Sequence, residues 1–549
     1  MKTSNNNKTS ILVVIPARSG SKGIAQKNLR LLSNKPLIYY SIKNALLSKY
    51  KPDVYVSSEG AEILSLSKKF GAKTIERKLS DANDQTTLDP VVFKAWKKAE
   101  SLEKKKYDLV ITIQPTSPLL EVNSIDSAIT KIIENSKIDT IISAVKDEHL
   151  SWKIKNKKYV PNYKNRLNRQ FLPDILRETG GFLITRAKSL TKNNRIGKNV
   201  DLYKLSYKES IDIDSHADWS LCEFFNNRKK ILFVLSGNKE IGMGHVYNCL
   251  LLANDILDHE VVFLVDSKSE MAFNKIVSKN FLVFKQIESD IVKDIKKLNP
   301  DIIINDKLDN NKSYIKSLKK LGCKVINFED LGHGARIADL TINAIYNQTN
   351  HKPNQYFGYK YFLLRDEFLY SNPISIKAKV SRILISFGGV DPNNFTQKVL
   401  SSIYSDCLKK NIKIIVVTGF GYKAYDTLGS FREIEIHKDV QNISDFMKQA
   451  DLAFTSAGRT IYEFASLNVP TIVLAQNNRE LSHFFADSKY GFVNLGLGTS
   501  VKNNTIRDNF LKLVQNKDKR KNMSKLMSKY DLSSGRKRVL SLIKQTINV

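Results

Sequence analysis

Short apolar runs of four to six residues recur along the chain and alternate with segments of helical character. Unbroken Ile, Val and Leu runs bounded by loops are typical of strands buried on both faces. Their alternation with helices predicts parallel, doubly wound sheets, so we expect an α/β protein throughout. The runs stand at residues 11–15, 54–58, 108–113, 140–145, 230–235, 261–265, 301–305, 324–328, 382–387, 413–418, 451–455 and 471–475.

The 549 residues exceed what a single hydrophobic core holds, so two or three domains are expected. The strand-loop-helix pattern restarts after the polar stretch "NNRKK" at 226–230, which places a domain boundary near residue 228. A second irregular stretch runs from 347 to 379. We therefore predict a first domain over 1–228 and two Rossmann-like lobes over 229–370 and 371–549, with a cleft between the lobes.

Composition narrows the class of protein. No apolar run approaches the ~18 residues of a membrane-spanning helix, and Arg18 and Lys22 follow the first run too closely for a secretory signal. We expect a cytoplasmic protein without a membrane partner. The net charge of +32 is spread along the chain without interleaved aromatic residues, which favours attraction of anionic small substrates over nucleic-acid binding. The scattered residues Cys222, Cys249, Cys323 and Cys407 predict neither disulfides nor a zinc site.

The stretch "ILVVIPARSGSKG" at 11–23 runs from a buried strand into two cations and two glycines. Gly20 and Gly23 permit a close backbone approach, while Arg18 and Lys22 can neutralise phosphates. A helix is expected to begin after Gly23. The alternative is a tight turn with solvated basic residues.

Two further segments supply complementary groups. In an extended "SIDIDS" at 210–215, Asp212 and Asp214 share one face and can bind Mg²⁺, although Asp214 or Ser215 could instead cap the following helix. "TIQPTSPLLE" at 112–121 ends a strand and exposes Gln114, Thr116 and Ser117 at the edge where open α/β sheets bind ligands, unless it is a simple proline turn.

Taken together, "IPARSGSKGIAQKNLRLLSNKPLI", "VYVSSEGAEILSLSKKFGA", "DLVITIQPTSPL" and "SIDIDS" resemble the CMP-sialic acid synthetases, or acylneuraminate cytidylyltransferases, over about 225 residues. The resemblance implies that the anomeric hydroxyl of a nonulosonic acid attacks the α-phosphorus of CTP and that pyrophosphate leaves. It also implies Mg²⁺ as the cofactor and a homodimer formed through this domain.

The same resemblance assigns roles to individual residues. Those expected at the CTP phosphates are Arg18, Ser21 and Lys22, with Lys27 and Asn28 completing the loop. Arg77, with Asp84 and Thr86, is placed near the cytidine, although Lys78 replaces the family's proline. Gln114 is expected at the sugar, and Asp212 and Asp214 at Mg²⁺. In "NRQFLPDILRETGGFL", the candidates for the sugar carboxylate and the dimer contact are Arg169, Gln170 and Arg177.

The second half contains a histidine at a glycine turn. In "ILFVLSGNKEIGMGHVYNCLLLA", Gly242 and Gly244 precede His245 at the start of a helix. A helix N-terminus disfavours imidazolium, so His245 could act as a base, or it could be a structural donor. "ISFGGVDPNN" and the block at 450–480 each end a strand in small residues before a helix, which suits a diphosphate. Gly388, Gly389 and Glu463 are the candidates there, Glu463 for ribose hydroxyls.

This half resembles the UDP-sugar hydrolases of pseudaminic acid biosynthesis and their spore-coat relatives, a GT-B-like group, over about 300 residues. The matching pieces are "IGMGHVYNCLLLA", "VINFEDLGHGARIADLTINAIY", "YFLLRDEF", "SFGGVDPNNFT" and "TSAGRTIYEFASLNVPTIVLAQNN". The resemblance implies that His245 activates water. The chain departs from the family at "VLSGNK", where R-x-D-x-S is usual, at Asn248 in place of an arginine, and at "NDKLDN" in place of D-x-Y.

The resulting hypothesis is a CMP-sugar synthetase fused to a UDP-sugar hydrolase-like module that takes a UDP-sugar. Three alternatives stay open. The second half could be a glycosyltransferase, or a non-catalytic module that binds a nucleotide sugar. The first domain could use an eight-carbon ulosonic acid.

Overall fold

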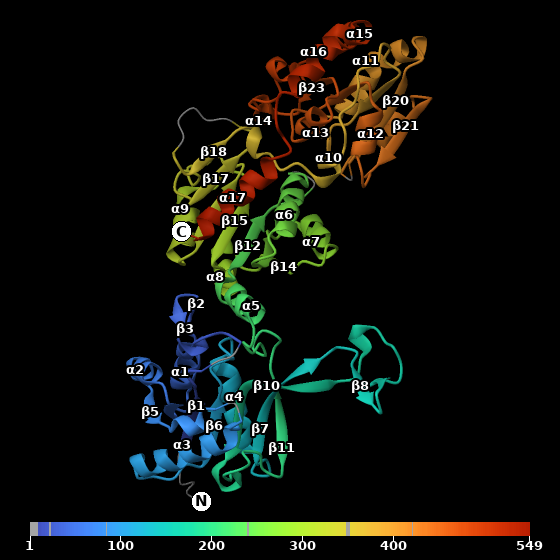
Figure 1. Cartoon of the computed structure of the whole chain (residues 1–549). Coiled ribbons are helices and arrows are strands. Elements are labelled where there is room, and N and C mark those ends of the chain that lie inside the picture. Colours follow the sequence, from blue (N-terminus) through green and yellow to red (C-terminus); the bar gives the residue numbers. More distant parts are fainter. Residues whose placement is uncertain are drawn as a thin grey trace, which may run out of the picture. The chain divides into compact units, whose positions relative to one another are not determined.

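The computed structural model describes residues 9–20, 23–83, 85–238, 241–346, 352–419 and 421–548. The chain forms two compact units, unit 1 over Met1–Arg228 and unit 2 over Lys229–Val549 (Figure 1). Strands stand at all the places that the apolar runs predict, which confirms the α/β class. In the described part of the chain, no helix has the length and apolar character needed to cross a membrane.

Unit 1 is built on one seven-stranded sheet. In spatial order its strands are β11 (Val200–Lys204), β7 (Thr140–Asp147), β10 (Ile175–Arg186), β6 (Leu109–Ile113), β1 (Ile11–Pro16), β4 (Asp53–Ser58) and β5 (Lys73–Glu76). The expectation of a wholly parallel sheet is wrong here, because β10 runs antiparallel to both β6 and β7. No helix lies between β7 and β10, and without a helical crossover the returning strand runs the opposite way.

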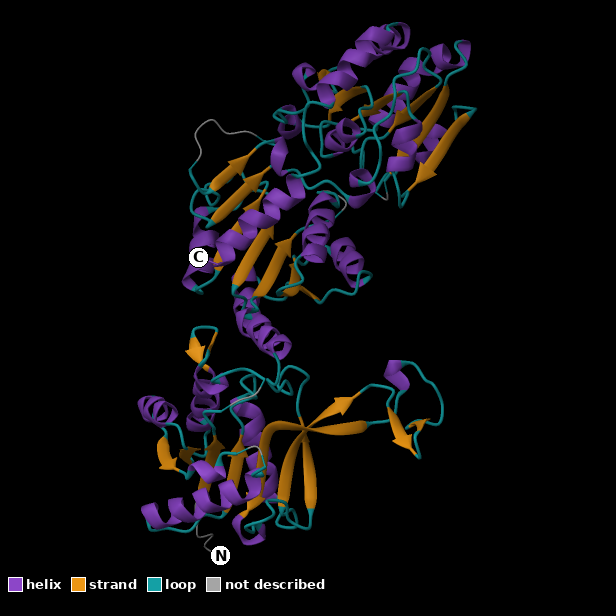
Figure 2. Ribbon diagram, viewed as in Figure 1, coloured by secondary structure: helices purple, strands orange, loops and turns teal. Residues whose placement is uncertain are grey.

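Helices cover both faces of this sheet (Figure 2). Val13 and Ile15 of β1 face the core shared with α1 and α4, whereas Leu12 and Val14 face α3. Burial on both faces is why the run lacks polar alternation. The helices are α1 (Leu37–Leu47), α2 (Ala61–Lys69), α3 (Leu88–Glu103), α4 (Val122–Glu134) and α5 (His216–Asn227).

Between β7 and β10 the chain leaves the sheet as an arm, which we define as residues 148–174 (Figure 2). The arm carries the hairpin of β8 (Trp152–Lys155) and β9 (Lys158–Pro161) and a 3₁₀ turn at Arg169–Phe171.

The helix expected after Gly23 is absent from the described residues. The chain instead makes a 3₁₀ turn at Lys27–Leu29 and a small hairpin of β2 (Leu31–Leu32) and β3 (Lys35–Pro36) before α1 begins. The Lys27 ammonium donates to the carbonyl oxygen of Ile213, so this turn is fixed by a distant segment.

Unit 2 contains two wholly parallel sheets, as predicted. The first lobe holds β14 (Val283–Lys285), β13 (Glu260–Val265), β12 (Lys230–Leu235), β15 (Ile302–Asp306), β16 (Lys324–Phe328), β17 (Leu340–Asn343) and β18 (Gln355–Phe357). The second lobe holds β21 (Ile434–Lys438), β20 (Lys413–Thr418), β19 (Arg382–Ile385), β22 (Leu452–Thr455), β23 (Thr471–Ala475) and β24 (Phe492–Leu497). Two Rossmann-like lobes in one unit are the GT-B-like arrangement that the sequence predicts.

Helices flank both sheets of unit 2 (Figure 1). In the first lobe they are α6 (Gly244–Asp255), α7 (Glu270–Val277), α8 (Ile291–Leu298) and α9 (Lys312–Lys320). Beyond them follow α10 (Asp366–Leu369), α11 (Phe395–Lys409), α12 (Ser444–Gln449), α13 (Thr460–Ser466), α14 (Asn478–Leu481), α15 (Asn503–Gln515), α16 (Lys517–Met527) and α17 (Gly535–Asn548).

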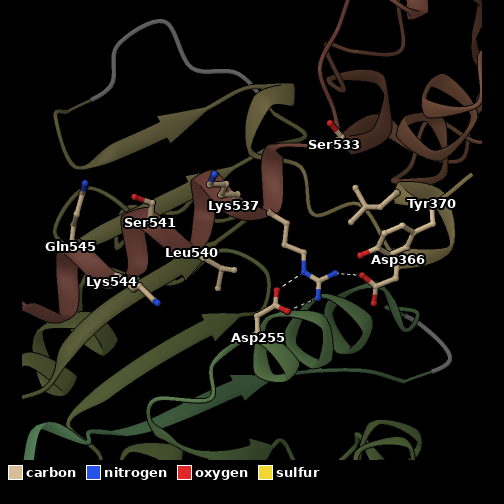
Figure 3. A pocket seen from close by; sticks show the side chains of 11 residues that line it. Asp255, Asp366, Tyr370, Ser533, Lys537, Leu540, Ser541, Lys544 and Gln545 are labelled. Atoms are coloured by element: carbon tan, nitrogen blue, oxygen red, sulfur yellow. Dashed lines mark hydrogen bonds and ion pairs between the residues drawn. The ribbon is translucent and has the colours of Figure 1, made fainter. Parts of the chain in front are cut away.

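The last helix does not stay in the second lobe. Val539 and Ile543 of α17 are buried in the core of the first lobe. Arg536 donates to Asp255 at the end of α6 and to Asp366 at the start of α10, beside an open pocket of about 960 Å³ (Figure 3). The predicted segment 371–549 is therefore not a single lobe, because its C-terminal helix completes the other one.

All four cysteines are free and buried, as expected for small apolar residues.

Candidate functional site

A pocket of about 320 Å³ in unit 1 gathers most of the predicted residues. It lies where β1 and β6 end, at the carboxyl edge at which open α/β sheets bind ligands. Of the predicted residues, the ones that line it are Arg18, Lys27, Asn28, Arg77, Thr86, Gln114, Thr116, Asp212 and Asp214. The predicted residues Ser21, Lys22 and Asp84 lie outside the described part of the chain.

The basic loop and the aspartate segment are in direct contact. A Cβ atom at Gly23 would lie 2.3 Å from the carbonyl oxygen of Asp214, so only glycine permits this approach. Lys27 Nζ lies 3.4 Å from Asp214 Oδ1. Asn28 Nδ2 donates to the carbonyl oxygen of Arg18 over 2.8 Å, which fixes the backbone that presents the Arg18 side chain.

Asp212 and Asp214 do not stand in a strand, although the alternation predicted for an extended segment holds. Ile211 and Ile213 are buried, and the Ile213 amide donates to the carbonyl oxygen of Thr116 over 2.8 Å. Ser215, and not Asp214, caps α5, in a capping box with Asp218. The capping alternative therefore explains Ser215 and leaves both aspartates to the pocket.

The Asp212 carboxylate has fewer partners than a largely buried charge needs. Its Oδ1 atom is buried and has no hydrogen-bond partner among the described residues. Burial raises the pKa of Asp212 overall and the Asp214 charge adds to this rise, although the nearby Thr116 hydroxyl and then Lys27 lower it. A buried carboxylate in this state is stabilised by a cation.

The pocket fits a magnesium ion that shares its ligands with a substrate. Among the described residues no group of three or more His, Cys, Asp or Glu side chains could hold a metal by themselves. Mg²⁺ is usually held by one or two carboxylates together with phosphate oxygens and water, so Asp212 and Asp214 suffice when a triphosphate is bound.

Sequence reasoning missed Glu59, which organises the cationic side of the pocket. The Glu59 carboxylate accepts hydrogen bonds from Arg77 Nη2 over 2.8 Å and from the Ser19 amide over 2.6 Å. Burial would raise the pKa of Glu59, but these donors lower it overall. Glu59 follows the end of β4, so its place after a buried strand was the available signal. Arg77, with 8% of its side chain exposed, is therefore committed to Glu59 and to the carbonyl oxygen of Ala17.

Four predicted residues do not line this pocket. Arg169 and Gln170 are exposed on the arm, where Arg169 pairs with Glu148 over 2.7 Å. Arg177 is exposed on the first part of β10. Ser117, the neighbour of Thr116, is buried and does not line the pocket.

Unit 2 has a cleft between its lobes, formed by two adjoining hollows of about 250 and 440 Å³. Glycine turns from both lobes line both hollows, namely Gly242, Gly244, Gly388 and Gly389. Gly388 has φ +78°, a conformation that favours glycine. The helix after this turn, α11, begins at Phe395, directly after the predicted stretch. The smaller hollow contains Glu463, and the larger one contains His245.

His245 is paired with a carboxylate that the sequence analysis did not select. Its Nδ1 atom lies 2.6 Å from Oδ1 of Asp306, a residue with 1% of its side chain exposed. Burial would raise the pKa of Asp306, but His245 first, then Arg459 and Asn248, lower it overall. An ionised Asp306 accepts a hydrogen bond from the Nδ1–H group, which leaves Nε2 as the ring nitrogen that can accept a proton.

Strand register brings this pair together. Asp306 ends β15, which pairs with β12 in parallel so that Leu235 lies opposite Asp306. The chain that follows β12 leads to His245. A carboxylate at the end of "DIIIND" was therefore detectable as a strand-end residue, but not as the partner of His245.

Two further polar side chains of the cleft, Glu463 and Asn248, each accept a hydrogen bond from an arginine. Arg365 donates to Glu463 over 2.8 Å, so Glu463 is a buried, paired carboxylate and not an exposed helical one. Arg459 Nη2 donates to Asn248 Oδ1 over 2.5 Å. Asn248, which replaces the arginine usual in the resembled hydrolases, thus lies against a guanidinium supplied by the second lobe.

Comparisons with known proteins agree with this division. A family model described as cytidylyltransferase matches residues 12–170. The chain is 23% identical over 488 residues to a Helicobacter pylori protein named pseudaminic acid cytidylyltransferase and UDP-2,4-diacetamido-2,4,6-trideoxy-beta-L-altropyranose hydrolase, covering 84% of this chain and 87% of that protein. Neither unit alone is that long, so this similarity extends over both.

Two other relatives match shorter parts. The CMP-N,N'-diacetyllegionaminic acid synthase of Campylobacter jejuni is 30% identical over 227 residues, which are 40% of this chain and 97% of that protein. The uncharacterized protein MJ1062 of Methanocaldococcus jannaschii is 33% identical over 273 residues, and the match spans 45% of this chain and 56% of that protein. The near-complete match to the synthase, together with the family model, shows that this chain belongs to the cytidylyltransferase family.

Proposed function

We propose that the chain is a fused enzyme, with a unit 1 that transfers CMP from CTP to a nonulosonic acid and a unit 2 that hydrolyses a UDP-sugar. The observation that carries the first activity is the contact between the basic loop at Gly23 and the aspartate segment at Asp214 within one pocket. The Helicobacter pylori relative, whose name joins both activities, supports the fusion.

In unit 1 the anomeric hydroxyl of the sugar attacks the α-phosphorus of CTP. The bond from that phosphorus to the bridging oxygen breaks, pyrophosphate leaves with the electron pair, and the hydroxyl proton goes to solvent. Arg18 and Lys27 line the pocket and neutralise the triphosphate, and we place Lys22 with them. Gln114 and Thr116 orient the sugar. Arg77 acts through Glu59, because that pair fixes the loop at Ser19.

Asp212 and Asp214 would hold Mg²⁺ when CTP is bound, and the ion would supply positive charge for the departing pyrophosphate. Without the ion, Asp212 is a partly buried carboxylate with a raised pKa, which is an unfavourable state at neutral pH.

Unit 1 forms a homodimer through the arm. The arm exposes large apolar side chains that an isolated unit leaves in water, with 54% of Trp152, 72% of Ile154, 78% of Tyr159 and 67% of Phe171 accessible. Contiguous apolar surface of this kind is typical of protein interfaces. Arg169 and Gln170 belong to the same arm and Arg177 follows it on β10, so their proposed role at the sugar carboxylate depends on this contact.

In unit 2 His245 Nε2 takes a proton from water, and the water oxygen attacks the anomeric carbon of the UDP-sugar. The bond from that carbon to the β-phosphate oxygen breaks, and UDP leaves with the electron pair. Asp306 stabilises the imidazolium that forms. Glu463 and the turn at Gly388 and Gly389 hold the nucleotide.

Pyrophosphate release tests the first activity. With CTP and Mg²⁺, we expect the full chain to turn over at least one of sialic, legionaminic and pseudaminic acid. Asp212→Asn should lower the rate by about a hundredfold or more, because a charged metal ligand is lost. Asp201→Asn, on a surface pair with Lys131, is the control and should leave the rate unchanged. A folded protein that uses none of the three acids would contradict the proposal.

The substitution Asp212→Asn, which should lower the rate, should at the same time stabilise the metal-free protein, because the pKa of Asp212 is raised. The native state binds this proton more tightly than the unfolded state does, so ionised Asp212 destabilises the metal-free protein at neutral pH. Asp212→Asn should raise the Tm at pH 7.5, because it removes this unfavourable charge. The gain should shrink as the pH falls through the raised pKa, because the wild-type carboxyl then becomes protonated.

Asp218→Asn is the matched control for this stability test. Burial would raise the pKa of Asp218, but hydrogen bonds from Ser215 lower it overall, so its charge stabilises the fold above its unfolded pKa. This variant should lower the Tm at pH 7.5. The same sign for both variants would argue against an unpaired charge at Asp212.

Light scattering tests the dimer. The full chain should have twice the mass of one chain. The double variant Ile154→Glu and Phe171→Glu should be a monomer, since two apolar side chains of the proposed interface become charged. Leu47→Glu, at a 58% exposed residue of α1 outside the arm, should leave the mass unchanged. A monomeric wild-type protein at micromolar concentration would refute this interface.

Asp306→Asn tests the second activity. The variant keeps the shape of the residue but removes the charge that fixes the His245 tautomer, so hydrolysis of UDP-2,4-diacetamido-2,4,6-trideoxy-β-L-altropyranose should fall by roughly 10²- to 10⁴-fold. CMP transfer by unit 1 serves as the internal control and should persist. If the variant hydrolyses this sugar as fast as wild type, the His245–Asp306 pair is not the catalytic one.

A further inference from the structure

Three arginines line the cleft of unit 2 in its described part, and they occupy different places. Arg365 lines only the hollow that contains Glu463, and Arg479 lines only the hollow that contains His245. Arg459 lines both hollows. A nucleotide sugar places its diphosphate between nucleoside and sugar, so the group that borders both hollows is the one nearest to a diphosphate spanning them.

The charges of Arg365 and Arg479 are already compensated. Arg365 lies 2.6 Å from Glu367 and 2.8 Å from Glu463, and so has two carboxylate partners. Arg479 makes two hydrogen bonds to the Asp309 carboxylate, over 2.8 and 3.2 Å. To bind a diphosphate with these donors, either guanidinium would have to break an ion pair that it already makes.

Arg459 is compensated much less. Its hydrogen-bond partner Asn248 is neutral, and the carboxylate of Glu329 lies 3.8 Å away, beyond hydrogen-bond distance. Asp306 is also near enough for Arg459 to lower its pKa, but its carboxylate oxygens are hydrogen-bonded to His245 and Asn248. Burial raises the pKa of Glu329 in spite of Arg459, which weakens Glu329 as a counter-ion. The Oε2 atom of Glu329 is buried and has no hydrogen-bond partner among the described residues. The cleft therefore holds a cation whose neutralisation is incomplete.

The Arg459 side chain is held in place but remains accessible. Its Cζ atom lies 5.4 Å from the centre of the Phe362 ring, and a Cβ atom on Gly244 would lie 3.4 Å from its Cδ atom. Its side chain is 21% exposed, compared with 4% for Glu329. The guanidinium thus lies beside the first turn of α6, one residue before His245, in an orientation fixed by Asn248.

From these observations we infer that Arg459 binds the diphosphate of the nucleotide sugar and stabilises the departing UDP, and that Asn248 positions its guanidinium. This inference rests on the proposed hydrolase function of unit 2 and names a residue for it. A guanidinium offers paired N–H donors to phosphate oxygens, and such charge-assisted bonds strengthen as the leaving group gains charge.

Calorimetric titration of the full chain with UDP and, separately, with uridine tests the inference. Arg459→Gln should weaken UDP binding about tenfold or more and change uridine binding less than about twofold, because only UDP carries the diphosphate. Arg459→Lys keeps the charge without the paired donors and should give an intermediate loss. A merely structural role would lower both affinities by the same factor. Any binding of UDP or uridine to unit 1 should be the same in all variants, because the substitutions lie in unit 2.

Two further variants sharpen the test. Arg507→Gln removes a surface arginine paired with Asp406 and should change neither affinity. Glu329→Gln removes the competing carboxylate, so UDP should bind as well as to wild type or more tightly. If Arg459→Lys and Arg459→Gln both bind UDP as wild type does, the inference is wrong.

The outcomes separate this inference from the proposed function. Loss of UDP binding alone in Arg459→Gln, in a wild-type chain that hydrolyses no UDP-sugar, would support the diphosphate contact and refute the hydrolase. A wild-type unit 2 that binds neither probe would overturn both.

Discussion

The functional groups of both units depend on where buried strands end. A strand that is apolar on both faces cannot carry a charged side chain until it leaves the core, so the first polar residues appear at its carboxyl end. Arg18 follows β1 in this way, Glu59 follows β4 and Gln114 follows β6. Asp306 is the last residue of β15. Parallel neighbours end at the same edge, and residues far apart in the sequence therefore meet there.

Buried charged residues of the two units fall into two groups: those paired with an opposite charge, and those whose charge no protein group fully compensates. A buried charge is tolerated when a partner compensates it, as in the Glu59–Arg77, Asp306–His245 and Glu463–Arg365 pairs. Asp212 and Glu329 differ, since each has a buried carboxylate oxygen without a partner among the described residues. Both lie beside a proposed phosphate-binding place. These incompletely compensated carboxylates thus mark the positions where we propose that substrate or metal binds.

In the proposed function both units bind a polyphosphate, and their pockets offer different groups for it. Unit 1 uses a cationic loop opposite two carboxylates, a combination suited to a metal-bound triphosphate. Unit 2 uses glycine turns and one guanidinium from the facing lobe, with no comparable pair of carboxylates proposed for a metal. The difference matches the proposed chemistry, because CTP brings a larger charge to its site than a UDP-sugar does.

Much of this could be predicted from the sequence alone. The apolar runs determined where the strands are, and the spacing of Asp212 and Asp214 determined that both project from the same side of a segment whose isoleucines are buried. These are local patterns, carried by neighbouring residues. Tertiary structure alone decided the pairings, since His245 and Asp306 are 61 residues apart and Arg459 and Asn248 are 211 apart. It also decided the antiparallel course of β10 and the return of α17 to the first lobe. Strand order and register set such contacts, and neither is written in the periodicity of any single segment.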